Sequence, residues 1–187
     1  YFEVAQLKQA VLHSFNALQD RIGTLNRASR TDPLTGLLNR RGLQQALDAL
    51  QVQGIPFAIL ALDIDRFKSI NDSYGHDVGD NAIVHIADQM RRYSRDSDIL
   101  CRAGGEEFLL LLPGISTESA RQAGERLRQH IADHPFEPVG TITVSLGVAH
   151  FPSFHVDAEQ ALRLADKALY MAKEQGRNRV VVYPYAD

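Results

Sequence analysis

Hydrophobic residues recur every three or four positions through the first 30 residues of the chain. They fall at Val4, Leu7, Val11, Phe15, Leu18, Ile22, Leu25 and Ala28, with no proline among them. This period predicts one long helix with an apolar stripe. Two successive spacings of four around Val11 resemble a stutter in a coiled coil. The stripe therefore predicts a coiled-coil helix, although a helix packed on its own domain has the same pattern.

Beyond Asp32-Pro33, which is expected to end this helix, apolar runs of strand length alternate with helical patterns. Strands are predicted at 57–62, 108–112, 141–149 and 180–183, and helices are predicted around 43–50, 78–93, 120–131 and 161–172. The glycines at 104–105 indicate one hairpin-like connection between strands. Strands separated by single helices predict a sheet covered by helices.

Composition narrows the class of protein. The chain has 187 residues, 44% of them hydrophobic, which is enough for one well-filled domain plus an appendage. The formal net charge of -3 gives no support for binding to nucleic acid or to an anionic membrane. Cys101 is the single cysteine, which excludes an internal disulfide and a thiolate zinc site. A reducing, cytoplasmic setting is therefore expected.

The chain is expected to divide into an N-terminal helix, residues 1–30, and a larger domain, residues 31–187. Its longest apolar runs are shorter than the roughly 20 residues that a membrane-spanning helix needs, so no membrane contact is expected from this fragment. The first residue is Tyr1 rather than methionine. We therefore expect a fragment, and a sensor or membrane anchor could precede it.

Two carboxylates, Asp63 and Asp65, follow the first buried strand. Residues two apart share one face if the strand persists, and the ends of strands open into a crevice. Carboxylate oxygens suit Mg²⁺, which takes one or two carboxylates and completes its octahedron with phosphate oxygens and water. A solvated turn or a helix cap would show the same pattern. The metal interpretation therefore depends on a partner elsewhere in the chain.

The segment Gly104-Gly105-Glu106-Glu107 supplies such a partner. Two glycines between strands favour a tight hairpin with positive φ and let a ligand approach the backbone. An ordinary surface hairpin would suit the glycines equally well. However, a turn needs no second acidic strand end, whereas a two-metal phosphoryl-transfer site needs both. Together the two acidic segments predict a metal-dependent phosphoryl-transfer site.

Several segments carry a wider resemblance, in the order 32–41, 63–72, 104–108, 145–149 and 173–178. In these segments the chain resembles the GGDEF family of diguanylate cyclases. The resemblance implies an α+β fold of the nucleotide-cyclase, ferredoxin-like type, with a central, mostly antiparallel five-stranded sheet flanked by helices. It also implies condensation of two GTP molecules into cyclic di-GMP with release of pyrophosphate. Arg66 and Ala103 depart from the family pattern, and neither departure removes a proposed ligand.

The resemblance implies roles for the acidic residues. Asp63 and Glu106 would bind the catalytic Mg²⁺, for which Mn²⁺ is an alternative, and the Ile64 carbonyl would assist. Glu107 would bind a second metal ion or lie near the attacking hydroxyl, and Glu106 and Glu107 would be the catalytic pair. This fits the chemistry, because divalent ions acidify a hydroxyl and neutralise charge on the leaving pyrophosphate.

The implied substrate residues are Phe67 and Lys68 through their main-chain amides, Asn71, Asp80, Gly104, Gly105, Lys173 and Arg177. Asn71 and Asp80 would read guanine, because an amide donates and accepts while a carboxylate accepts from the guanine N1–H and 2-amino group. Lys173 and Arg177 would hold the terminal phosphates. Their spacing of four predicts one helical face, which would also suit a solvated basic helix end.

Arg95 and Asp98 match the family's RxxD inhibitory site, where cyclic di-GMP binds away from the active site. The arginine would bind a phosphate or stack on guanine, and the aspartate would accept from the guanine edge. A further arginine, Arg126 or Arg128, is expected from a partner subunit.

One domain would hold one GTP while the product joins two, so the expected enzyme is a homodimer paired through the N-terminal helix. Two other classes stay open. One is a receptor that binds cyclic di-GMP at the RxxD site without turnover, and the other is a related nucleotide cyclase or hybrid dinucleotide synthase. Intact Asp63, Glu106 and Glu107 favour the enzyme over the receptor, and Asp80 favours guanine.

Overall fold

The computed structural model describes residues 2–152 and 157–185, and of residues 2 and 24–28 the backbone alone. Contacts divide the chain into two compact units, Tyr1–Arg30 and Thr31–Asp187, which we describe separately. None of the helices in the described ranges combines the length and hydropathy that a bilayer span requires.

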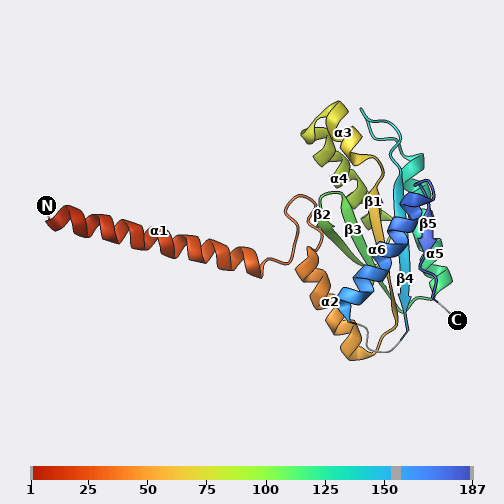
Figure 1. Ribbon diagram of the computed structural model, residues 1–187, viewed down its shortest axis with the longest axis horizontal. Helices are drawn as coiled ribbons and strands as arrows, with labels where there is room; N and C mark the ends of the chain where they lie inside the picture. The colour runs from red at the N-terminus through yellow and green to blue at the C-terminus, as the bar shows by residue number, and fades with distance from the viewer. Residues whose placement is uncertain (1, 153–156, 186–187) are drawn as a thin grey trace. The chain divides into compact units, whose positions relative to one another are not determined.

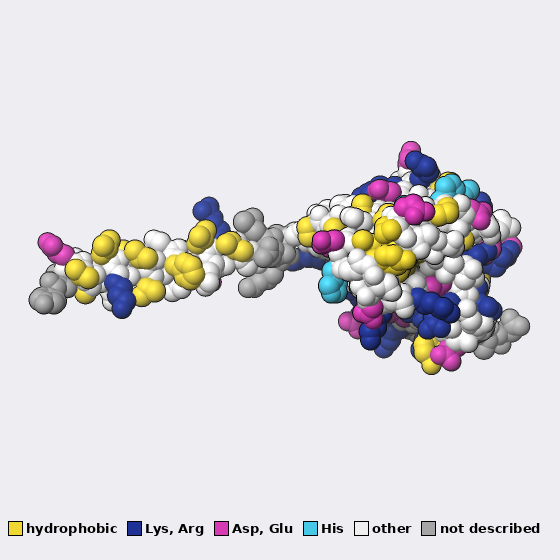
Figure 2. All heavy atoms as spheres, turned by 90° about the horizontal axis from the view of Figure 1, so that it is seen from above, with side chains coloured by type: hydrophobic (Ala, Val, Ile, Leu, Met, Phe, Trp, Pro, Cys, Tyr) yellow, Lys and Arg dark blue, Asp and Glu magenta, His cyan; other side chains and the backbone are white. Residues whose placement is uncertain are grey.

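The first unit consists of helix α1 (Phe2–Ala28), so the predicted long helix is confirmed. Hydrophobic side chains line it in Figure 2. The stripe residues Val4, Leu7, Val11, Phe15, Leu18 and Ile22 are between 50% and 72% exposed. The side chains of Leu25 and Ala28, the last two stripe positions, lie outside the described residues. Within this single chain the described part of the stripe is therefore open to solvent.

The second unit alternates helices and strands, as predicted. Its elements are α2 (Arg40–Gln53), β1 (Phe57–Ile64), α3 (Phe67–Tyr74), α4 (His76–Arg92), β2 (Ile99–Gly104), β3 (Glu107–Pro113), α5 (Thr117–Asp133), β4 (Val144–Phe151), α6 (Ala158–Glu174) and β5 (Val180–Val182).

The five strands form one sheet in the order β2-β3-β1-β4-β5 (Figure 1). β1 lies at the centre and pairs antiparallel with β3 and β4, while β2 pairs antiparallel with β3. The one parallel pairing in the described sheet joins β4 to β5. The expected α+β fold, with a mostly antiparallel five-stranded sheet flanked by helices, is confirmed.

The sheet separates two hydrophobic cores because successive residues of a strand point to opposite faces. On one face Leu60 and Phe108 pack with residues of α4 and α5. On the other face Ile59 and Leu109 pack with residues of α2 and α6. Figure 1 shows α6 running across the sheet on this second face. Every residue of β1 is buried, which explains its nearly continuous apolar sequence.

Gly147 of β4 lets α6 approach the sheet closely. A Cβ atom at this position would lie 2.1 Å from the Leu169 amide nitrogen and 2.5 Å from the Ala165 carbonyl oxygen, both backbone atoms of α6. Any larger residue would therefore push the helix outwards. This close packing holds the C-terminal half of α6 above the sheet, where its polar side chains meet the ends of β1 and β3.

Two predicted boundaries were wrong. The strand predicted over 141–149 is observed as β4, Val144–Phe151, because residues 141–143 leave the strand. There the Thr143 hydroxyl donates to the Asp65 carboxylate at 2.8 Å, a contact that sequence periodicity does not report. The first helix was predicted over residues 1–30 and ends two residues earlier, at Ala28.

Candidate active site

The end of β1 brings two of the predicted metal ligands together. Asp63 is the register partner of Glu107 on β3 and of Ser145 on β4. Directly opposed residues of antiparallel strands project from the same face of a sheet. Asp63 and Glu107 therefore present their carboxylates side by side, on the face that α6 covers.

Helix α6 supplies a charged partner to each of these carboxylates. The Lys173 ammonium donates to Oδ2 of Asp63 and forms an ion pair with it. Asp166, two turns earlier on α6, shares a hydrogen bond with Glu107. The sequence analysis gave Asp166 no role, although its spacing of seven from Lys173 places both residues on one face of the helix.

Burial dominates the electrostatics of the pair. Burial, together with the neighbouring Asp166 carboxyl, raises the pKa of Glu107 to about 7. Burial also raises the pKa of Asp63, and the Lys173 ammonium offsets this rise only in part. The Glu106 carboxylate adds to the rise for Asp63, so Glu106 contributes negative charge to the same cluster.

These carboxylates could bind a divalent cation whose remaining ligands come from substrate and water. Asp63 Oδ1 and Glu107 Oε1 are buried and have no hydrogen-bond partner. No three carboxylate, imidazole or thiolate groups converge around a metal position in the described ranges. Mg²⁺ is commonly held by one or two carboxylates plus phosphate oxygens and water, so two adjacent carboxylates with free oxygens suit it.

The backbone places Glu106 beside the end of β1, since the Ile64 amide donates to the Glu106 carbonyl at 3.4 Å. Asp65 is engaged by other donors, although its negative charge also contributes to the raised pKa of Asp63. Its carboxylate accepts from the Ser145 hydroxyl at 2.6 Å and the Asn178 amide at 3.0 Å, in addition to Thr143. Three donors therefore already engage the Asp65 carboxylate, whereas Asp63 keeps one oxygen without a partner, and joint action of the two acids on a metal ion stays a prediction.

The glycine hairpin is open on its outer side. Gly104 and Gly105 join β2 to β3 with φ angles of 153° and 46°, and a Cβ on either would meet no atom within 4 Å. Backbone in this region favours glycine. The hairpin therefore leaves room for a ligand beside Glu106 and Glu107, as predicted from the glycine pair.

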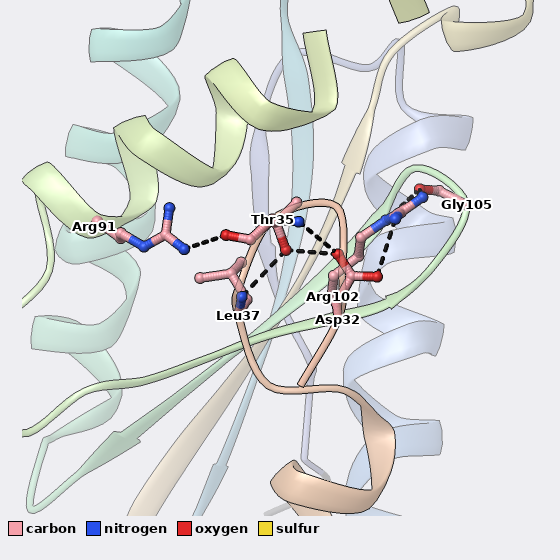
Figure 3. Close-up of polar contacts among 6 residues, drawn as sticks. All are labelled: Asp32, Thr35, Leu37, Arg91, Arg102 and Gly105. Atoms are coloured by element: carbon pink, nitrogen blue, oxygen red, sulfur yellow. Dashed lines mark hydrogen bonds and ion pairs between the residues drawn. The ribbon is translucent and has the colours of Figure 1, made fainter. Parts of the chain in front are cut away.

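Arg102 clamps this hairpin from within β2. Its Nε and Nη2 atoms donate to the Gly105 carbonyl at 3.0 Å and 2.8 Å, and its Nη1 donates to Asp32 at 3.1 Å (Figure 3). Asp32 also accepts from the Thr35 hydroxyl at 2.7 Å, and Arg91 of α4 donates to the Thr35 carbonyl. The sequence analysis missed Arg102, because its partner Asp32 lies 70 residues away.

The two residues expected to read guanine lie where α3 meets α4. Asn71 is on α3, and a Cβ added to Gly79 of α4 would lie 1.8 Å from its Oδ1 atom. That oxygen is buried without a hydrogen-bond partner. Asp80, the residue after Gly79, is exposed. Phe67 and Lys68 form the first turn of α3.

The expectation that Lys173 and Arg177 share one helical face was wrong. Helix α6 ends at Glu174, and Gly176, Arg177 and Asn178 have φ angles of 123°, 65° and 46°. This left-handed stretch reverses the chain after Lys173. Lys173 therefore points to Asp63, whereas Arg177 lines a separate cleft with residues of α3.

The predicted inhibitory residues border a different cavity, of about 320 Å³. Arg95 donates to Asp98 Oδ1 from Nε at 3.1 Å and from Nη2 at 2.9 Å. Arg126 of α5 lines the same cavity within this chain, and the contribution of an arginine by a partner subunit stays a prediction. Arg128 does not line it and pairs instead with Glu125.

Comparisons with known proteins point to one family. The sequence profile of the family described as "Diguanylate cyclase, GGDEF domain" matches residues 29–179. Diguanylate cyclase DgcP of Pseudomonas aeruginosa is 38% identical over 202 residues, covering 96% of this chain and 30% of the relative. The chain spans less than half the length of the curated relatives it matches.

Two solved structures are similar in fold. The coiled coil and GGDEF domain of DgcB from Caulobacter crescentus, in complex with c-di-GMP, has a TM-score of 0.76 at 29% identity, covering 95% of this chain and 97% of that one. The active GGEEF domain of a diguanylate cyclase from Vibrio cholerae has a TM-score of 0.73 at 35% identity, covering 80% and 99%.

Proposed function

The chain belongs to the GGDEF domain family of diguanylate cyclases, and from this premise we propose that it condenses two GTP molecules into cyclic di-GMP and releases two pyrophosphates. The observation that carries the proposal is the pair of carboxylates Asp63 and Glu107, each with one buried oxygen that lacks a hydrogen-bond partner, beside the open glycine hairpin. Such an oxygen cluster is what a phosphoryl-transfer site needs beside a nucleotide.

The proposed reaction joins the 3′-hydroxyl of one GTP to the α-phosphorus of another. A divalent ion, Mg²⁺ or Mn²⁺, would acidify that hydroxyl and neutralise charge on the leaving pyrophosphate. Asp63, Glu106 and Glu107, with the Ile64 carbonyl, would hold it. Lys173 would exchange its present contact with Asp63 for the phosphates of the substrate.

Substrate selection would come from α3 and α4. The unpartnered Asn71 oxygen and the exposed Asp80 carboxylate would both accept from guanine, whose N1–H and 2-amino group are donors. Adenine has no donor at those two positions. The open backbone at Gly104 and Gly105, with the first turn of α3 at Phe67 and Lys68, would accommodate the phosphates.

We further propose a homodimer as the active species, because one chain supplies half of the cyclic product. The exposed apolar stripe of α1 supports this, since a second copy of α1 would cover it as a coiled coil. The cavity beside Arg95, Asp98 and Arg126 would take cyclic di-GMP as an inhibitor, with the arginines on its phosphates. The domain would work in the cytoplasm, where GTP is available.

The test is product analysis after incubation with GTP and Mg²⁺. Cyclic di-GMP with pyrophosphate supports the proposal, binding of cyclic di-GMP without turnover indicates a receptor, and a mixed or monocyclic product indicates another cyclase. Replacing Glu107 by Gln removes one acidic ligand, so we expect at least a hundredfold loss of turnover, with binding at Arg95 and Asp98 unchanged. Glu159→Gln, an exposed exchange on α6, is the matched control.

A further inference from the structure

Helix α5 contacts the turn that follows α6 through one arginine, Arg128. Its Nη1 atom donates to the side-chain oxygen of Asn178 at 2.8 Å, across 50 residues of sequence. Its Nε atom donates to the Glu125 carboxylate at 3.0 Å, and its Nη2 atom donates to the same carboxylate and to the Gln129 side chain. The Arg128 side chain is only 14% exposed. A largely buried guanidinium therefore joins the helix to the turn.

The turn that Arg128 contacts holds its backbone in an unfavourable conformation. Arg177 and Asn178 have φ angles of 65° and 46°, although neither residue is glycine. Non-glycine residues in this region cost about 1 kcal/mol or more each, and they persist where the surrounding contacts fix them. Without such contacts the two residues would relax towards negative φ, and the Arg177 side chain would move with them.

Backbone hydrogen bonds fix the two ends and the middle of this turn. At its start the Arg177 amide donates to an α6 carbonyl at 3.0 Å, and at its end the Arg179 carbonyl accepts from a β4 amide at 2.9 Å. In the middle the Asn178 amide donates to the Asp65 carboxylate at 3.0 Å. Asp65 therefore anchors the backbone of the turn from the sheet, and Arg128 holds the Asn178 side chain from α5.

Helix α5 is well placed to hold the turn because it packs against β5, the strand that the turn enters. A Cβ added to Gly124 of α5 would lie 3.4 Å from a side-chain carbon of Val180 on β5. Arg128 lies one helical turn further along the same face of α5, and Asn178 lies two residues before Val180. The packing of α5 on the sheet therefore fixes the position of Arg128, and Arg128 in turn fixes Asn178.

We propose that Arg128 is a positioning residue for the proposed reaction: it holds Asn178, and with it the turn that carries Arg177, in the conformation that binds the nucleotide. The role rests on the proposed function, in which Arg177 binds the terminal phosphates. A planar guanidinium suits this role, since two of its nitrogens hold Glu125 and the third reaches Asn178. The sequence analysis considered Arg128 only for the inhibitory site.

The first test measures the turn itself and needs no turnover. Arg128→Met keeps an apolar stem and removes the guanidinium. Hydrogen exchange followed by mass spectrometry should show residues 176–179 exchanging about tenfold faster in this variant. Arg121→Met is the matched control, because Arg121 pairs with Glu118 three residues earlier on the same helix. It removes the same charge and should leave this exchange unchanged. Unchanged exchange of the turn in folded Arg128→Met would overturn the inference.

Nucleotide binding supplies the second test. 3′-Deoxy-GTP carries the triphosphate but lacks the attacking hydroxyl, whereas GMP lacks the terminal phosphates. Calorimetric titration should show affinity for 3′-deoxy-GTP about tenfold lower in Arg128→Met, an intermediate loss in Arg128→Lys, and unchanged affinity for GMP. Equal losses for both nucleotides would contradict the role, because they would indicate a general loosening of the domain. Circular dichroism checks that each variant is folded, and Arg128→Lys carries both tests where Arg128→Met does not fold.

Asn178→Gly shows whether Arg128 acts through Asn178. Glycine keeps the backbone amide and accepts positive φ, but it removes the oxygen that Arg128 holds. Arg128→Met should therefore have little further effect on 3′-deoxy-GTP affinity in the Asn178→Gly background. The same tenfold loss in both backgrounds would refute the inference. A chain in which Arg128→Met loosens the turn but which makes no cyclic di-GMP would refute the proposed function and leave the link between Arg128 and the turn standing.

Discussion

A single carboxylate outside the metal cluster, Asp32, connects the start of the catalytic unit to the glycine hairpin. It accepts from the Thr35 amide at 2.9 Å and from the Thr35 hydroxyl, and it pairs with Arg102, which holds Gly105. Burial by itself would raise the pKa of Asp32. The hydrogen bonds from Thr35 and the charge of Arg102 outweigh it, so the pKa is lowered.

This lowered pKa gives a prediction for stability. A carboxyl whose pKa is lower in the folded than in the unfolded state stabilises the fold above its unfolded pKa of about 4, and this contribution disappears as pH falls through the folded pKa. Asp32→Asn should therefore lower the free energy of unfolding by about 1–2 kcal/mol at pH 7. Urea denaturation from pH 7 to pH 3 should show this difference shrinking towards low pH.

The control is Asp48→Asn, which changes an exposed carboxylate of α2. It should leave the free energy of unfolding within a few tenths of a kcal/mol. A difference between Asp32→Asn and the unaltered protein that stayed constant across the pH series would contradict the role given to ionised Asp32.

At this scale the sequence predicted the acidic residues at the ends of buried strands, but not the side chains that contact them. Asp63 and Glu107 stood out because two acidic segments occur together beside buried strands, which an ordinary turn does not require. Asp166 lies on a helix and Arg102 lies on a strand. The hydrophobic periodicity of each element already accounts for a polar residue at that position, so neither residue drew attention. Their roles depend on contacts between segments far apart in sequence, such as the 110 residues between Asp63 and Lys173. Such contacts leave no local pattern to detect.

At the scale of elements, the position of α6 decides whether the site forms. This helix carries Asp166 and Lys173, and it rests on Gly147 of β4. Because the nearest atoms to an added Cβ belong to the α6 backbone, no side-chain rotation can make room for it. Gly147 therefore sets the distance between α6 and the sheet, although this residue has no side chain in the site.

Gly147→Ala tests this directly. Overpacking against backbone should lower the free energy of unfolding by about 3 kcal/mol, and it should move Lys173 away from Asp63. Denaturation by guanidinium chloride measures the free energy of unfolding, and the affinity for GTP reports the displacement of Lys173. In Gly124→Ala the added Cβ would lie 3.3 Å from the flexible Leu60 side chain, so this control should be neutral or slightly stabilising. Equal stability of the two variants would show that α6 is not held at this point.

Helices and strands were predictable where the hydrophobic pattern extends over many residues. β1 and α1 followed from their patterns, and the hairpin followed from its two glycines. The ends were not predictable. Helix α6 stops before Arg177 because the chain reverses through left-handed residues, and Asn178 then donates to the buried Asp65. These ends are fixed by tertiary contacts, which override local propensity.

At the scale of the whole molecule, the proposed reaction needs two chains while the structure describes one. Two catalytic units must bring their bound GTP molecules face to face, and the exposed stripe on α1 offers a means of pairing. Six apolar side chains on one face of a 27-residue helix are at least half exposed. A helix with an open stripe of this kind gains stability by burying it against a second copy.

The stripe therefore predicts that activity depends on protein concentration. Val11→Glu places a charge at the centre of the stripe, where Val11 is 60% exposed in the single chain. It should weaken dimerisation at least tenfold, because pairing would bury this charge without a partner. Analytical ultracentrifugation should show the weaker dimer, and specific activity should fall at low protein concentration and recover at high concentration. A protein shortened to begin near Arg30 should behave in the same way, more strongly.

Gln9→Glu introduces the same charge on the opposite side of α1, about 160° around the helix at 100° per residue. It should leave both dimerisation and activity unchanged, because that side stays in solvent when the stripes pair. The glutamates introduced at positions 9 and 11 carry the same charge on the same helix. They differ only in the face of α1 on which they lie. Equal effects of both exchanges would point to a general electrostatic effect on α1. Full activity of the shortened protein at low concentration would remove α1 from the mechanism and leave the catalytic units to pair by their own surfaces.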